Sequence, residues 1–226
     1  MKKQFSTIVG IALILMGLIA VALNISIPLL GLDVWMWGPW RLWPLIVIGV
    51  GLLFVIPPLI YRENPGLAGL FIPGIPILTT GGILLFCSLF NAWGAWAWLW
   101  PLEVLAFGLG FLLAALFLDV IWLLIPAFII SANGALFLFC TITGLWQIWA
   151  ALWTIEPLSL GLSFLVIDAR KKIPGLRIAG LILSGFAAIG LFGMSAILRG
   201  YWFINMLGPV VLILVGLGIM LWQPKK

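Results

Sequence analysis

Two glutamates, each placed beside a proline, are the residues of this chain with the clearest chemical potential. Glu103 follows Pro101 by two residues, and Glu156 immediately precedes Pro157. Because proline suits the first position of a helix, both carboxylates are expected at helix N-termini, where the positive end of the helix dipole stabilises them. Acidic groups near a bilayer are costly unless they are hydrated or paired. Two interpretations follow: helix capping in the hydrated interface, or a cation or proton site at the outer mouth of a helix bundle.

Tryptophans flank both glutamates and form a second candidate site. Two sets of three share the spacing i, i+3, i+7, which places three indoles on one face of a helical turn. An aromatic belt is one interpretation, because indole combines an apolar ring with an N–H that needs a partner and so favours the headgroup level. The other is a platform for a lipid headgroup, a sugar or a flat pigment. The sets are Trp93, Trp96 and Trp100, and Trp146, Trp149 and Trp153.

The residue types exclude several other chemistries. The chain has no histidine, the usual ligand of haem and zinc and the commonest general base. Its two cysteines, Cys87 and Cys140, are too few to hold an iron–sulfur cluster or a structural zinc alone. A disulfide between them is conceivable, but small buried fillers are the favoured interpretation. We therefore expect no catalytic residue, metal, cofactor or enzymatic activity.

The composition requires a bilayer around the chain. Hydrophobic residues make up 65% and charged residues 8%, with a mean hydropathy of +1.33. Globular proteins contain only about 45–50% apolar residues. The basic residues are scattered over short connections rather than gathered in a stripe, so a nucleic-acid partner is not expected.

A repeating proline sets the predicted organisation. Pro44, Pro101, Pro157 and Pro209 are 57, 56 and 52 residues apart, and each opens an apolar span that follows a turn. Internal repeats of this period define the architecture. The sequence predicts an all-α, polytopic membrane protein of eight transmembrane helices in one membrane domain, residues 1–226. Its four two-helix repeats are expected at about 1–62, 63–118, 119–172 and 173–226.

A transmembrane helix needs ~20 residues to cross the bilayer core, and most of the predicted spans approach this length. The sixth is short, and we expect it to gain length from Ala150–Thr154. Thr79, Thr80 and Asn133 are polar residues within the spans, at equivalent places in the second and third repeats. Interhelical hydrogen bonding and helix-end geometry are the favoured interpretation, and a transport site at broken helices is the alternative. The predicted spans are Phe5–Leu23, Trp43–Tyr61, Leu67–Phe90, Leu99–Leu118, Ile121–Thr143, Ile155–Ile167, Ile178–Leu198 and Phe203–Trp222.

Small residues recur every four positions in two of the spans and predict close helix packing. Lipid gives helices no hydrophobic drive to associate, so small residues that allow the backbones to approach supply the attraction. The two rows are Ala106, Gly110 and Ala114 in the fourth span, and Gly180, Ser184 and Ala188 in the seventh.

The basic residues predict the orientation of the chain. With eight spans both termini lie on one side, together with nine of the eleven basic residues, while Arg41 and Arg199 lie opposite. Cytoplasmic connections carry the excess of lysine and arginine. We expect both termini in the cytoplasm.

The stretch from Gly10 to Phe54 carries a family resemblance. It contains Gly10-Ile-Ala-Leu-Ile-Leu-Met-Gly17 and Arg41-Leu-Trp-Pro-Leu-Ile-Val-Ile-Gly49-Val-Gly51. This pattern resembles the two-helix transmembrane region of LiaI/LiaF-like bacterial envelope-stress proteins. The resemblance implies a bacterial inner-membrane protein, here without the soluble domain that follows the helices in LiaF-like proteins.

These observations favour a non-enzymatic inner-membrane scaffold, regulator or accessory subunit of a larger membrane assembly. Its expected partners are the lipid bilayer and other membrane proteins or a second copy of the chain. One alternative is a transporter of small solutes or ions that uses Glu103 and Glu156. Another is a lipid- or pigment-binding protein that uses the two tryptophan sets. Every charge can be placed near an interface rather than at mid-bilayer, which favours the scaffold over the transporter.

Overall fold

The structure of the protein is a computed structural model. It describes residues 38–197 without interruption, and in addition residues 10–11, 13–18, 21, 206, 209–214 and 216–217. Among these residues every regular element is helical, and no strand occurs. About half of each of the predicted spans Phe5–Leu23 and Phe203–Trp222 lies outside the described residues. Arg199 and the lysines at both ends of the chain also lie outside them.

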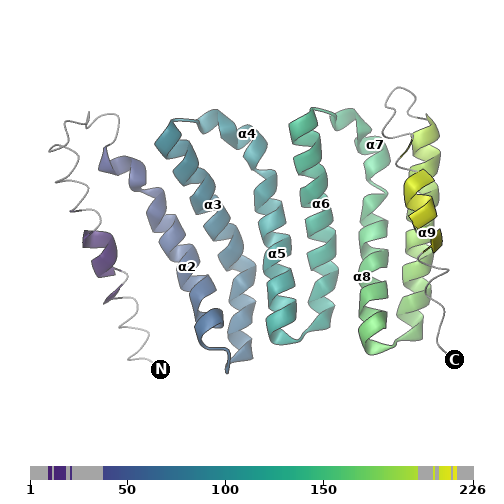
Figure 1. Ribbon diagram of the computed structural model, residues 1–226, viewed down its shortest axis with the longest axis horizontal. Coiled ribbons are helices and arrows are strands. Elements are labelled where there is room, and N and C mark those ends of the chain that lie inside the picture. Colours follow the sequence, from purple (N-terminus) through teal and green to yellow (C-terminus); the bar gives the residue numbers. More distant parts are fainter. Residues whose placement is uncertain are drawn as a thin grey trace.

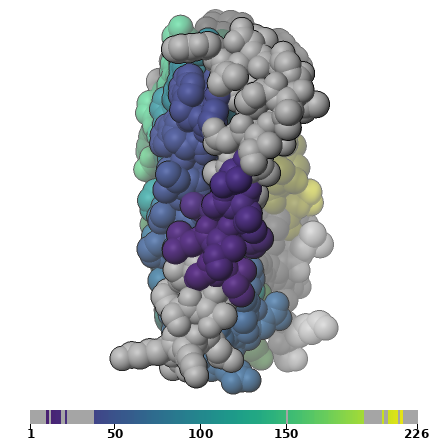
Figure 2. Space-filling model, turned by 90° about the vertical axis from the view of Figure 1, so that its left-hand side faces the viewer, coloured from purple at the N-terminus to yellow at the C-terminus, as the bar shows by residue number. Residues whose placement is uncertain are grey.

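The long helices stand side by side in chain order and alternate in direction (Figure 1). Each packs against the next, so α2 to α9 form a single row. Figure 2 views this row from its α2 end. The α-helices are α2 (Pro44–Ile60), α3 (Phe71–Phe90), α4 (Trp96–Leu99), α5 (Pro101–Leu118), α6 (Leu124–Thr143), α7 (Trp149–Leu152), α8 (Ile155–Lys171) and α9 (Pro174–Ile197). Short 3-10 helices lie between them: η1 (Pro39–Leu42), η2 (Pro65–Leu70), η3 (Trp93–Ala95), η4 (Ile121–Leu123) and η5 (Trp146–Ile148).

Five helical segments are long and apolar enough to cross a membrane. They are Pro39–Ile60, Pro65–Phe90, Pro101–Leu118, Ile121–Thr143 and Pro174–Met194. Because 18 or more consecutive apolar residues indicate a transmembrane helix, the chain is a multi-pass membrane protein by length and composition. Between 17% and 33% of the residues in the most apolar stretch of each span are buried within the structure.

Helix α8 does not lengthen in the predicted way. Ile155–Lys171 has 17 residues, about 26 Å of helix. The expected extension through Ala150–Thr154 is wrong, because Trp153 and Thr154 form a turn that separates α7 from α8. The helix instead continues past Ile167 to Lys171, and Asp168 in its last turn takes part in an ion pair described below.

Prolines and left-handed residues set the helix ends. Pro44 and Pro101 open α2 and α5, where a missing N–H costs nothing. The helices α3, α5 and α8 end at Asn91, Asp119 and Lys172, each with positive φ. Helix α6 ends at Gly144, with φ of 70°, the conformation that glycine adopts without strain. These left-handed ends turn the chain sharply and so bring successive helices back alongside one another.

Small residues lie where the helices approach most closely. A Cβ added to Gly110 of α5 would lie 2.7 Å from the Phe71 carbonyl oxygen of α3, and one on Gly180 of α9 would lie 2.9 Å from the Gly161 carbonyl oxygen of α8. The structure buries all the residues of the two predicted packing rows: Ala106, Gly110, Ala114, Gly180, Ser184 and Ala188. Close backbone approach of this kind permits the dispersion contacts that hold helices together in lipid.

Polar side chains within the row bond mainly to their own helix. The Thr80 hydroxyl donates to the Pro76 carbonyl oxygen at 3.0 Å, and the Asn133 amide donates to the Ile129 carbonyl oxygen at 3.0 Å. The Ser163 hydroxyl donates to the Leu160 carbonyl oxygen at 2.7 Å. The described bond of the Asn133 side chain thus lies within α6, to the carbonyl four residues earlier.

Candidate functional site

The predicted site residues lie at one end of the row, in two connections of the same build. The connection from α3 to α5 passes through Asn91, η3 and α4, and the connection from α6 to α8 passes through Gly144, η5 and α7 (Figure 1). Each tryptophan set begins in the 3-10 turn and continues into the short α-helix. The change of helix type within each set means that the spacing i, i+3, i+7 does not follow one regular helical face.

Three tryptophan rings from the two connections meet one phenylalanine ring of α6. We call these four residues the aromatic cluster: Trp100, Phe137, Trp146 and Trp149. The planes of Trp100 and Trp146 are 12° apart, with ring centroids 6.5 Å apart. Phe137 of α6 lies 5.2 Å from Trp100 and 5.4 Å from Trp149, measured between ring centroids. Aromatic pairs of this kind stabilise a contact by about 0.5–1.5 kcal/mol in addition to the contribution of the apolar surface that they bury. The aromatic cluster thus joins the α3–α5 hairpin to the α6–α8 hairpin.

The other tryptophans of the two sets lie apart from this cluster. Trp93 and Trp96 are 47% and 37% exposed. Trp153 is 42% exposed and contacts Phe186 of α9 edge-on, with ring centroids 6.3 Å apart. Sequence reasoning missed Phe137, one of fifteen phenylalanines. The one signal in the sequence was its position one turn before Cys140, near the C-terminal end of α6.

Glu103 and Glu156 occupy different surroundings. Glu103 lies in the first turn of α5, partly buried beside Thr80 of α3, and its Oε1 is buried without a hydrogen-bond partner. Glu156 lies in the first turn of α8 and is exposed. Among the described residues no hydrogen bond or ion pair links the two carboxylates or joins either one to a basic residue. Their positions at helix N-termini suit negative charge in both cases.

Arg41 is the basic residue described at this end of the row. Its Nη1 donates to the Leu89 carbonyl oxygen of α3 at 3.2 Å, and its own carbonyl oxygen accepts from the Ser88 hydroxyl at 2.7 Å. The guanidinium carbon lies 5.6 Å from the centroid of the Trp40 ring. A cation at the last carbonyls of a helix is stabilised by the negative end of the dipole. Arg41 therefore caps α3 rather than pairing with a glutamate.

An ion pair that sequence reasoning missed lies at the opposite end of the row. Arg177 Nε of α9 and Asp168 Oδ2 of α8 are 2.7 Å apart, with Asp168 fully buried and Arg177 35% exposed. Asp168 Oδ1 has no hydrogen-bond partner. A carboxylate in the last turn of a helix is repelled by the negative end of the helix dipole. Arg177 must therefore offset this repulsion and also the desolvation cost of burying the Asp168 carboxylate. The available signal was an acidic residue directly after an apolar span, nine positions before an arginine across the predicted turn.

The cysteines are free and lie in separate hydrophobic clusters. Cys87 packs with Ile83 and Ala95, while Cys140 packs with Leu136 and Ile148. Both thiols are fully buried, and each lies where a connection meets the helix that precedes it. Within the part of the chain that the structure describes, no group of three or more histidine, cysteine, aspartate or glutamate residues could hold a metal ion.

Fold and site together define the class of this protein: an all-helical, multi-pass membrane protein whose described helices form a single row. A comparison with known proteins finds no significant match, whether to a protein family, a curated protein or a solved structure.

Proposed function

We propose that the protein is a non-enzymatic scaffold, regulator or accessory subunit of a larger assembly in a bacterial inner membrane. The observation that carries the proposal is the single row of helices, in whose five apolar spans only 17–33% of the residues are buried. On α9 alone, Ile178, Ile182, Phe186 and Ile189 are 56–68% exposed. Lipid covers such faces in isolation, and small or apolar helix faces of other membrane proteins cover them in an assembly.

The proposal includes four two-helix repeats and eight spans. Its support is the shared order of elements in the two described connections, together with the position of Cys87 and Cys140 at the outer end of α3 and α6. The resemblance of residues 10–54 to LiaI/LiaF-like envelope-stress proteins supports a bacterial origin and a regulatory role. Helix α8, at 17 residues, would be the shortest span among those described.

Transport of a small solute or ion is the second candidate, and Glu103 is the observation that favours it. A carboxylate oxygen that is buried without a partner is costly unless it binds a proton, a cation or water. The scaffold is favoured because Glu156 is exposed, and because the Thr80 hydroxyl and the Asn133 amide each donate to a carbonyl of their own helix. Transport sites use ionisable groups or broken helices near mid-bilayer. The third candidate, a lipid- or pigment-binding platform, is disfavoured because Trp100, Trp146 and Trp149 pack against other rings.

The proposed orientation places the α8–α9 turn in the cytoplasm. Of the described basic residues, five lie at that end of the row, against Arg41 at the other: Arg62, Arg170, Lys171, Lys172 and Arg177. By the positive-inside rule, a reporter fused after residue 172 should give a cytoplasmic signal, and one inserted at residue 98 a periplasmic signal. The reverse pair of signals would refute the orientation.

The assembly itself is tested by crosslinking in intact membranes. A photoreactive amino acid at Ile182 on the exposed face of α9 should yield defined products larger than the 24.7 kDa chain. Leu191 of the same helix is 2% exposed and serves as the matched control, since a probe there faces the row itself. Identification of the products by mass spectrometry distinguishes a second copy from another protein. A chain that crosslinks only to lipid at Ile182, and purifies as a monomer in mild detergent, would contradict the proposal.

A further inference from the structure

The turn between α8 and α9 carries cations on both of its arms. Lys171 lies in the last turn of α8, Lys172 ends that helix with φ of 54°, and Arg177 lies in the first turn of α9. Both lysines are exposed, and among the described residues neither takes part in an ion pair. Together with the Asp168 carboxylate, these three cations give the turn a net charge of +2.

Arg170 of the same turn faces the other side of α8. It lines a small cavity with Asp119, at the left-handed end of α5, and with Ile121 and Leu124 at the start of the α6 arm. A guanidinium and a carboxylate that line one cavity offset each other's charge. The cations on the α9 side are therefore Lys171, Lys172 and Arg177.

Asp168 holds the Arg177 guanidinium in one orientation. Arg177 Nε lies 2.7 Å from Asp168 Oδ2, and the carboxylate is fully buried while Arg177 is 35% exposed. The ion pair uses Nε alone, and in the described part of the chain neither Nη atom of Arg177 makes a hydrogen bond. The fork that the two Nη groups form matches the spacing of two phosphate oxygens. A fixed guanidinium thus keeps its Nη end available for a bidentate contact.

Fold stability alone does not explain this ion pair. Asp168 lies at the negative end of the α8 dipole and Arg177 at the positive end of the α9 dipole, so each charge occupies the unfavourable end of its helix. Well-packed apolar residues often replace a buried ion pair without loss of stability. What an apolar pair cannot provide is a cation positioned at the surface of the turn.

The turn lies at the edge of the apolar part of α9. The span Pro174–Met194 begins there, and Ile178, directly after Arg177, is 60% exposed. In a bilayer, lipid covers this exposed apolar face, so the start of the face marks the depth of the lipid headgroups. Basic residues immediately outside a transmembrane helix attract anionic headgroups.

We propose that the α8–α9 turn binds the phosphate of an anionic phospholipid. The two Nη groups of Arg177 donate hydrogen bonds to two phosphate oxygens, a contact that any phospholipid can make. Lys171 and Lys172 supply the net positive charge that favours an anionic headgroup over a zwitterionic one. The inference goes beyond the proposed function and does not depend on it, because it requires only that α9 spans a membrane.

Native mass spectrometry of the whole protein, taken from mixed micelles of phosphatidylglycerol and phosphatidylcholine with identical chains, tests the proposal. The wild type should retain phosphatidylglycerol in preference to phosphatidylcholine. The double variant Lys171→Gln, Lys172→Gln should lower that preference about fivefold for each cation removed, the contribution of one cation near a membrane surface.

A variant of unchanged net charge tests the guanidinium. Asp168→Leu combined with Arg177→Met removes one charge of each sign, so a diffuse attraction for anionic lipid would not change. The proposal predicts that retention of phosphatidylglycerol falls about tenfold, the lower end for hydrogen bonds to a charged group. If this variant fails to fold, the lysine variant still decides, because both lysine side chains are exposed.

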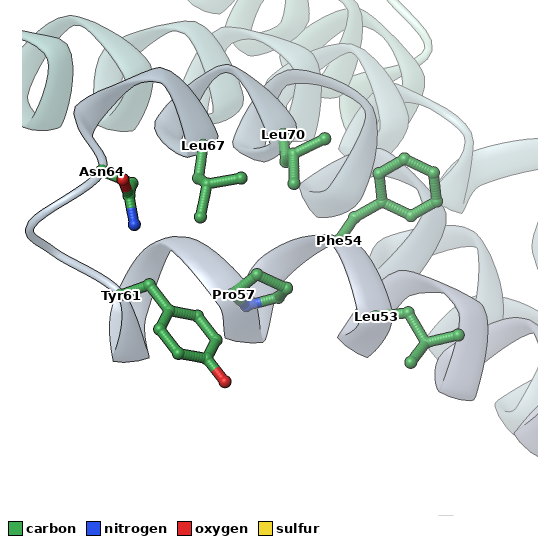
Figure 3. Close-up of a pocket in the computed structure, with 7 residues that line it drawn as sticks. All are labelled: Leu53, Phe54, Pro57, Tyr61, Asn64, Leu67 and Leu70. Atoms are coloured by element: carbon green, nitrogen blue, oxygen red, sulfur yellow. The ribbon is translucent and has the colours of Figure 1, made fainter. Parts of the chain in front are cut away.

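The cavity of about 380 Å³ between α2 and η2 provides one control (Figure 3). Figure 3 shows Leu67 and Leu70 on one side, facing Phe54 and Pro57 on the other. The residues that line this cavity are uncharged, so a lipid held there would not be selected by its headgroup charge. Leu67→Trp, which fills the cavity, should leave the preference for phosphatidylglycerol unchanged.

Arg62→Gln is the second control, because it removes an exposed cation at the same end of the row on the first described hairpin. It should also leave the preference unchanged. A loss as large per cation as in the lysine variant would mean a diffuse attraction and would overturn the proposal, as would a loss in Leu67→Trp. Unchanged retention in the ion-pair variant would remove the role of Arg177. Displacement of the lipid by inorganic phosphate, but not by ammonium acetate of the same ionic strength, would mean a site for a free anion instead.

Discussion

Replacing Arg177 by Met is expected to destabilise the folded protein by about 3 kcal/mol, the lower end of the range for breaking a buried ion pair. The substitution leaves the fully buried Asp168 carboxylate without its cation, in the last turn of α8 where the helix dipole already opposes negative charge. We place the value at the lower end because Arg177 is 35% exposed and water partly solvates the pair. Thermal or denaturant unfolding in mild detergent measures the change.

Two variants separate loss of the pair from loss of packing. Asp168→Leu combined with Arg177→Met removes both charges, and its stability should recover most of the loss, since an apolar pair can replace a buried ion pair. Lys171→Met changes an exposed cation in the same turn and should leave stability within about 0.5 kcal/mol of the wild type. The account of this pair fails if Arg177→Met unfolds like the wild type.

Replacing Gly110 by Ala is expected to cost about 1–3 kcal/mol, because the added methyl overpacks the contact between α5 and α3. The Cβ would lie 2.7 Å from the Phe71 carbonyl oxygen and 3.0 Å from the Ile72 Cα. Both are backbone atoms, so relief requires the helices to move apart rather than a side chain to rotate. Unfolding in detergent again supplies the measurement.

Gly82 provides the matched control for this substitution. It lies within α3, is exposed, and has no atom within 4 Å of the position of an added Cβ. Gly82→Ala should therefore stabilise the protein slightly, by about 0.5–1 kcal/mol, because alanine favours the helix more than glycine does. If the two variants behave alike, helix propensity dominates and close packing at Gly110 does not hold the helices together.

The sequence predicted the helical class and the described spans because a bilayer imposes a simple rule of length and hydropathy on each segment. Trp43–Tyr61 and Leu99–Leu118 differ from the observed helices by one or two residues, since proline marks the helix starts. The rule says nothing about contacts across the row. The C-terminal end of α8 was missed for this reason, because Asp168 ends the apolar run in the sequence but is buried beside Arg177, nine residues away.

The candidate site was only partly predictable. The sequence predicts that Glu103, Glu156 and the tryptophans lie at one end of the row, because they fall between consecutive apolar spans. This prediction depends only on neighbouring residues in the sequence. The difference between a partly buried Glu103 and an exposed Glu156 depends on which neighbouring helix lies beside each carboxylate. The aromatic cluster likewise needed the side-by-side arrangement of two hairpins, because Phe137 comes from α6 and its partners come from two connections.

The central claim is that the protein acts through helix contacts and does not carry a solute or ion. Its most direct test is flux across reconstituted vesicles, with proton- or cation-driven uptake measured for the wild type, for empty vesicles and for the double variant Glu103→Gln, Glu156→Gln. The substitutions retain size and remove only charge, at a cost of about 0.3–1 kcal/mol for each dipole interaction, so the double variant should fold. We predict that all three preparations give the same background flux. A flux that is present in the wild type and absent from the double variant would contradict the account and establish the glutamates as a transport site.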